Sequence, residues 1–114
     1  MEEKSSLHIL WTNADVETSQ LMVMMYATNS MISHWWDEVT VIIWGATARL
    51  AAENVQIQEA IQVARNVGVQ FSACIACARQ LGVIEKLEAQ GIEVIPWGVP
   101  LTEVLKGSGK LITV

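Results

Sequence analysis

The chain has 114 residues, of which 52% are apolar, and a formal net charge of −5 from seven basic and twelve acidic side chains. Its length fits a single domain, residues 1–114. A nucleic-acid-binding domain gathers basic residues on one face, because neutralising phosphates supplies much of its affinity. The few, scattered Lys and Arg residues here therefore argue against a nucleic-acid partner.

The N-terminal segment 1–6 is acidic and polar, without the basic region and the apolar stretch of a signal peptide. The densest apolar run, residues 21–27, is far shorter than the roughly 20 residues that span a bilayer. We therefore expect a cytoplasmic protein with no membrane partner. In that reducing compartment, two cysteines are more typical of catalysis or metal binding than of a structural disulfide.

Short apolar runs and helical patterns alternate along the chain. The runs predict five strands, at residues 7–11, 39–44, 69–73, 92–95 and 111–114. The intervening patterns predict five helices, at residues 16–33, 56–66, 74–81, 83–90 and 100–106. Because alternating strands and helices pair in parallel through crossovers, the sequence predicts a three-layer α/β/α fold with an open, mainly parallel five-stranded sheet.

The first predicted helix is apolar on every side. Residues 21–27 are all apolar, and Met31, Ile32, Trp35 and Trp36 continue this character. A surface helix of a small domain packs only one face against the sheet, so we expect the other face to contact a second copy of the chain. Burial inside the domain, or a flexible apolar ligand surface formed by the methionines, are the alternatives.

The two cysteines follow the third predicted strand at the start of a predicted helix. Cys74 is expected at the carboxyl end of its strand, where parallel sheets place their ligand sites, and beside the free amides of a helix N-terminus, which favour a thiolate. Cys77 lies one helical turn later on the same face, where it can share a proton with Cys74 or resolve a mixed disulfide. Arg79 is near enough in sequence to add positive charge.

Two other interpretations of the pair remain. Cysteine often acts as a small buried apolar residue, and alanines surround both positions. A structural zinc site needs four ligands, and the other nitrogen donors are His8, within the first strand, and His34, after the first helix. We interpret both histidines as packing or surface residues, and we expect no metal and no cofactor.

The order of these segments resembles the DsrE/DsrF-like family of small sulfur-relay proteins over nearly the whole chain. The segments that carry the resemblance are Asn13-Ala14-Asp15 before a long apolar helix, Val41-Ile42-Ile43-Trp44-Gly45, Val69-Gln70-Phe71-Ser72-Ala73-Cys74, Ala78-Arg79-Gln80-Leu81-Gly82-Val83, and Gly91-Ile92-Glu93-Val94. The resemblance implies a homo-oligomer, often a trimer or a hexamer, with a cysteine after the third strand that accepts a persulfide and passes it to a partner. By position that cysteine is Cys74, whereas Cys77 departs from the commonest pattern, in which a polar residue stands there.

The hypothesis is therefore a sulfur-carrier or sulfurtransferase-like protein that exchanges sulfur with donor and acceptor proteins through a persulfide on Cys74, with Cys77 assisting its release. Residues that follow neighbouring strand ends should approach the same rim, mainly as helix caps and turn residues: Asn13, Asp15, Gly45 and Thr47. Trp97, after the fourth strand, is expected to form one wall of the pocket around Cys74. A dithiol–disulfide redox protein that uses the same pair and a non-catalytic oligomeric binding module are the alternatives.

Overall fold

The computed structural model describes residues 4–114, so the first three residues of the predicted domain and of its acidic N-terminal segment lie outside the described part. Five strands form one sheet in the order β4-β3-β2-β1-β5, and every neighbouring pair is parallel. The strands are β1 (Ser6–Trp11), β2 (Glu38–Ile43), β3 (Gln70–Cys74), β4 (Glu93–Ile95) and β5 (Lys110–Thr113). The predicted parallel α/β/α fold is confirmed.

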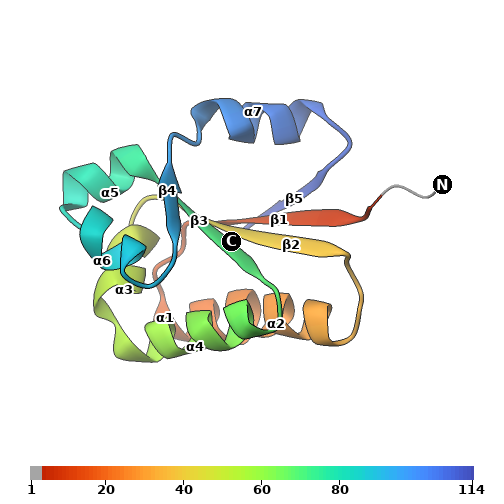
Figure 1. Ribbon diagram of the computed structural model, residues 1–114, viewed down its shortest axis with the longest axis horizontal. Helices are drawn as coiled ribbons and strands as arrows, with labels where there is room; N and C mark the ends of the chain where they lie inside the picture. Colours follow the sequence, from red (N-terminus) through yellow and green to blue (C-terminus); the bar gives the residue numbers. More distant parts are fainter. Residues whose placement is uncertain (1–3) are drawn as a thin grey trace.

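Helices cover both sides of this sheet (Figure 1). They are α1 (Val16–Thr18), the π-helical η1 (Ser19–Met24), α2 (Met25–Ile32), α3 (Thr47–Glu53), α4 (Val55–Asn66), α5 (Ile75–Leu81), α6 (Ile84–Glu88) and α7 (Gly98–Lys106). Figure 1 shows α1, α2 and α4 on one side and α7 on the other. Among the described helices, none is long and apolar enough to cross a membrane.

The predicted first helix is present, and its cap is now defined. Asp15 is the N-cap residue, because its carboxylate accepts a hydrogen bond of 2.9 Å from the Thr18 amide. Asn13 supports this turn by accepting 2.9 Å from the Asp15 amide. The middle of the helix widens into the π-helical segment η1, a local feature that the apolar pattern does not reveal.

The prediction is incomplete between β2 and β3, where it has one helix and the structure has two. Helix α3 packs through Ala48, Ala51 and Ala52, all buried, and it ends at Asn54. The Asn54 side chain then caps α4 by accepting 3.0 Å from the Ile57 amide. The sequence pattern predicts only the second of these helices, because the buried side chains of the first are small and give a weak apolar spacing.

The main core lies between the sheet and the α1–α4 layer. Alternate strand residues point into it, among them Ile9, Trp11 and Val41, all fully buried. Trp11 is the largest of these, and its indole N–H donates to Ser19 Oγ at 3.0 Å and to the Asn13 carbonyl at 3.1 Å. This core fixes the strand ends, and with them the turns that carry the predicted site residues.

The opposite face of the sheet, called the open face below, faces α7. It carries polar side chains toward the amino ends of the strands and a small apolar cluster toward their carboxyl ends. The cluster consists of buried Ile42, Cys74 and Trp97, with Leu10, Trp44, Cys77, Ile95 and Leu101 packed around them. Cys74 therefore belongs to this second cluster and not to the main core.

The first helical segment is not buried within the chain, because one of its sides faces outward. Leu21 is 63% exposed, Met25 49% and Ile32 56%, while Val23 and Ala27 on the other side are fully buried. Tyr26 of α2 and Trp35, beyond its end, are in aromatic contact with ring centroids 5.8 Å apart and ring planes tilted by 36°. The outward side of this segment thus exposes several large apolar side chains.

Candidate functional site

Cys74 lies where the sequence places it, at the carboxyl end of β3 and at the N-cap of α5. Its backbone is extended, with φ −68° and ψ 117°, so the chain turns directly from strand into helix. The side chain is only 5% exposed and packs in the cluster with Ile42 and Trp97. The predicted nucleophile is therefore covered in the resting structure.

Cys77 lies one turn into α5 and is half-buried. Its Sγ accepts a hydrogen bond of 3.2 Å from the backbone N–H of Gly45, in the turn after β2. Gly45 has φ +73°, a conformation that glycine adopts without strain, and a Cβ at this position would meet nothing within 4 Å. The backbone conformation, and not lack of space, thus favours glycine where an amide must point at the sulfur.

The two thiols interact with each other. Burial raises the pKa of Cys77, the Gly45 amide lowers it in part, and the neighbouring Cys74 thiol raises it further. Because the net effect is a raised pKa, Cys77 stays protonated at neutral pH and can donate its proton toward Cys74. Both cysteines are free in this structure.

Thr47 supports the turn that carries Gly45. It is fully buried, and its hydroxyl donates 2.7 Å to the Trp11 carbonyl at the end of β1. The same oxygen accepts 3.2 Å from the Trp44 amide at the end of β2. Thr47 therefore ties two neighbouring strand ends together and acts on the cysteines only through the position of Gly45.

Three predicted rim residues have no described bond to the sulfurs. The side-chain hydrogen bonds of Asn13 and Asp15 stay within the turn that starts α1. The Thr18 amide lowers the pKa of Asp15, which is the behaviour of a helix cap. Arg79 is exposed in the last turn of α5, where its charge favours the carboxyl end of that helix.

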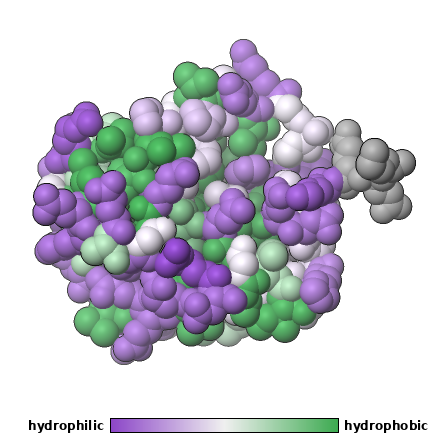
Figure 2. Space-filling model, in the orientation of Figure 1, coloured by the Kyte–Doolittle hydropathy of each residue, from purple (hydrophilic) through white to green (hydrophobic). Residues whose placement is uncertain are grey.

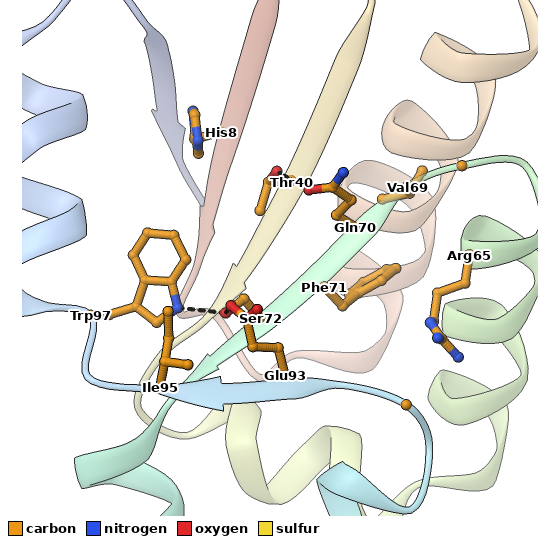
Figure 3. A pocket seen from close by; sticks show the side chains of 12 residues that line it. His8, Thr40, Arg65, Val69, Gln70, Phe71, Ser72, Glu93, Ile95 and Trp97 are labelled. Carbon is orange, nitrogen blue, oxygen red and sulfur yellow. Dashed lines mark hydrogen bonds between the residues drawn. The ribbon is translucent and has the colours of Figure 1, made fainter.

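Trp97 covers the other side of Cys74. It is 7% exposed, and its indole N–H donates 2.7 Å to Ser72 Oγ (Figure 3). Ser72 in turn donates 2.9 Å to Glu93 Oε1, on the neighbouring strand β4. This chain of two hydrogen bonds fixes the indole ring in its place against Cys74 and Ile42.

Sequence reasoning missed Ser72 and Glu93. One signal was present, since Ser72 precedes Cys74 by two residues and so shares its side of the strand. Glu93 becomes its neighbour only through the register Ser72↔Glu93 between β3 and β4. Cys74 thus packs in one cluster with Cys77 and Trp97; Gly45 bonds to Cys77, and Ser72 with Glu93 holds Trp97.

No metal-binding cluster supplements this site in the described part of the chain. Within residues 4–114, no group of three or more His, Cys, Asp or Glu side chains is placed to hold a metal ion. His8 is half-buried on the open face, and His34 is exposed after α2 with φ 57°.

Comparison with known proteins gives a family. No protein-family model matches the sequence, and no curated protein matches it either. A solved structure of BT1422, a conserved protein of unknown function from Bacteroides thetaiotaomicron, is 36% identical in sequence, with a TM-score of 0.94. The match covers 96% of this chain and 95% of that one. The chain belongs to the same family as BT1422.

Two more distant structures share the fold of the BT1422 family. The ychN protein from E. coli matches over 96% of this chain and 99% of its own, at 14% identity and a TM-score of 0.70. MTH1491 from Methanobacterium thermoautotrophicum, a protein of unknown function, matches over 98% and 100%, at 15% identity and a TM-score of 0.73. The chain therefore has a DsrE/YchN-like fold.

Proposed function

We propose that this protein is a sulfur carrier that holds a persulfide on Cys74. The observation that carries the proposal is the thiol pair: Cys77 packs in the same apolar cluster as Cys74, its Sγ accepts 3.2 Å from the Gly45 amide, and its raised pKa keeps it protonated. A hydrogen-bond donor at this position stabilises an anionic sulfur on Cys74, which is the form that attacks and the form that leaves.

The proposed loading step is a sulfur exchange without net oxidation. The Cys74 thiolate attacks the outer sulfur of a donor persulfide, R–S–SH. A new S–S bond forms on Cys74, the S–S bond of the donor breaks, and R–S⁻ leaves and takes up a proton. In unloading, an acceptor thiolate attacks the outer sulfur of the Cys74 persulfide, and Cys74 leaves as a thiolate that the Cys77 S–H stabilises.

The surface around Cys77 supports exchange with partner proteins. Figure 2 shows apolar side chains gathered over α5 and the adjoining end of β4. Cys77 and Ile95 are both partly exposed there, and Ala76 is exposed. An apolar rim around a reactive sulfur is suited to transient docking of donor and acceptor proteins, because it excludes water from the exchanging sulfurs. We place this relay in the cytoplasm, where cysteines stay reduced.

We also propose that the chain is a homo-oligomer, with the trimer or hexamer of the DsrE/DsrF-like resemblance as the expected state. The outward apolar side of the first helical segment supports this, since Leu21, Met25 and Ile32 are about half exposed or more. Native mass spectrometry of the parent should give a single oligomer. A Leu21→Glu/Met25→Glu variant should give monomers, and Val99→Glu, a change of an equally exposed valine on α7, should not.

Intact-protein mass spectrometry after incubation with a persulfide donor tests the sulfur-carrier proposal. The parent should gain one reducible sulfur atom, Cys77→Ser should gain it more slowly, and Cys74→Ser should gain none. Glu59→Gln, an exposed change on α4, serves as a control that leaves both thiols and their surroundings in place. Equal loading of Cys74→Ser and the parent would contradict the assignment of Cys74 as the sulfur-carrying residue.

A dithiol–disulfide redox protein is the second candidate, and the packing of both free cysteines in one cluster favours it. It predicts that a mild disulfide oxidant converts the pair into an intrachain bond with a measurable reduction potential. Loading with sulfur, without formation of that bond, would decide for the carrier. Slow labelling of both thiols, together with unchanged partner binding in a Cys74→Ala/Cys77→Ala variant, would instead indicate a non-catalytic binding module.

A further inference from the structure

The open face of the sheet contains a groove of about 590 Å³ that leads to Trp97 (Figure 3). Its floor and walls come from all the strands between β1 and β4: His8, Thr40, Gln70, Ser72, Glu93 and Ile95 line it, with Trp97 at one end. A second cavity of about 580 Å³ lies on the other side of Trp97, beneath α7. Both cavities are of the size that small-molecule ligands occupy.

Trp97 separates this groove from the sulfur of Cys74. It lines the groove and, at the same time, packs in the buried cluster with Cys74 and Ile42. Cys74 itself does not line the groove. Rotation of the indole away from Ser72 would join the groove to the sulfur, and the hydrogen bonds of 2.7 and 2.9 Å through Ser72 to Glu93 oppose that rotation.

The charge beside this barrier is negative. Among the described residues that line the groove, Glu93 carries the negative charge and Arg65 the positive one. Figure 3 shows Glu93 beside Ser72 and Trp97, and Arg65 at the end of the groove away from Trp97. Arg65 is also bound, since Nη1 donates 2.7 Å to the Gln90 carbonyl and 3.2 Å to Gln62 Oε1.

We propose that this groove is the binding site for a small aminothiol that exchanges sulfur with Cys74, and that Trp97 is the gate between them. The ammonium group of the aminothiol pairs with Glu93, which draws that carboxylate away from Ser72 and releases the indole. The sulfur then reaches Cys74. The proposal rests on the sulfur-carrier function, and the step is the balanced exchange given above, with R–S–SH an aminothiol persulfide and R–SH its product.

Thiol labelling in a Cys77→Ser background tests the gate, because Cys74 is then the only cysteine. A neutral reagent should label Cys74 slowly. Ser72→Ala should accelerate labelling about fivefold, the factor that one net hydrogen bond represents, and Trp97→Phe, which lacks the donor, should do the same. Ser19→Ala is the matched control, because it removes an equivalent indole–serine bond of 3.0 Å, between Trp11 and Ser19 in the main core.

Equal acceleration by Ser72→Ala and Ser19→Ala would mean that Cys74 is reached by general unfolding, and it would overturn the gate. Unchanged labelling in both Ser72→Ala and Trp97→Phe would overturn it as well. Labelling that slows as protein concentration rises would assign the groove to contact between copies of the chain, and this result also contradicts the proposal.

Two methanethiosulfonates of similar size and opposite charge test the ligand class. Cationic aminoethyl methanethiosulfonate should label Cys74 several-fold faster than the anionic sulfonatoethyl compound, and Glu93→Gln should reduce this ratio at least threefold. Glu59→Gln, an exposed change on α4, is the control. An unchanged ratio in Glu93→Gln would overturn the aminothiol assignment.

These measurements are separable from the sulfur-carrier test. Labelling requires only a reachable thiol. If the labelling results agree with the gate but the protein never loads sulfur, the proposed function is contradicted and the gate is retained. If Cys74 loads sulfur equally in the parent, Ser72→Ala and Glu93→Gln, the proposed function is retained and the gate is contradicted.

Discussion

Replacing Thr47 by valine tests whether the buried threonine supports the cysteine site. Thr47→Val exchanges a fully buried hydroxyl for a methyl group of similar size. The Trp11 carbonyl loses its bond of 2.7 Å from Thr47, while the Trp44 amide keeps a backbone bond of 3.2 Å to the same carbonyl. The change therefore removes hydrogen bonds without opening a cavity.

The expected cost is about 1–2 kcal/mol, because one or two buried hydrogen bonds are lost and their partners keep other bonds. With a urea dependence of about 2 kcal/mol per molar, the unfolding midpoint should fall by roughly 0.5–1 M. The exposed Thr102 bonds the Gly98 carbonyl at 2.8 Å within α7 and provides the control Thr102→Val, whose midpoint should stay close to that of the parent.

The same variant should change the chemistry of Cys77. Loss of the tether loosens the turn and lengthens the bond from the Gly45 amide to Cys77 Sγ, now 3.2 Å. Because this bond lowers the pKa of Cys77, that pKa should rise further. The pH dependence of alkylation, measured in a Cys74→Ser background, gives it directly. Equal urea midpoints and superimposed alkylation profiles for Thr47→Val and its parent would refute the reasoning.

Three further predictions concern pH, backbone conformation and capping. The folded-state pKa of Cys77 is raised. Its contribution to stability is therefore fully present below the unfolded thiol pKa of about 8.5 and is lost as pH rises through the folded value. In urea melts, Cys77→Ser should lose less stability at alkaline pH than the parent. Gly91→Ala should cost more than Gly82→Ala in thermal melts, because both have positive φ but only at Gly91 would a Cβ lie 2.5 Å from Arg65 Nη2; equal costs would show that Arg65 moves aside freely. Asn54→Ala should lower the stability by about 1 kcal/mol through loss of the α4 cap, and Asn54→Asp should restore it in urea melts.

Local patterns in the sequence were enough to predict the sheet and its main helices. The alternation of apolar runs with helical spacing gave the parallel architecture, and the transition after Phe71-Ser72-Ala73 placed Cys74 at a strand end. Both features depend on residues close together in the chain, which is why the sequence reveals them. Helix α3 was missed because its buried side consists of a threonine and alanines, which give a weaker apolar pattern than the isoleucines of α4.

The surroundings of Cys74 depend on contacts between distant segments. The Gly45–Cys77 bond joins the β2–α3 turn to α5, and Glu93 meets Ser72 only through the register of β3 and β4. Trp97 was expected as a wall, but its hydrogen bond to Ser72, two residues before the cysteine, follows from tertiary packing alone. Sequence reasoning therefore predicted Cys74 and Trp97 and missed Ser72 and Glu93, which hold the indole in place.

Localisation of the transferred sulfur tests the central claim most directly. Trypsin should release residues 66–79 as one peptide that contains both cysteines, and fragmentation after loading and alkylation assigns the added sulfur to one of them. We predict that it lies on Cys74 in the parent and in Cys77→Ser. Sulfur found on Cys77, or on neither cysteine after prolonged incubation with the donor, would contradict the assignment of Cys74 as the carrier.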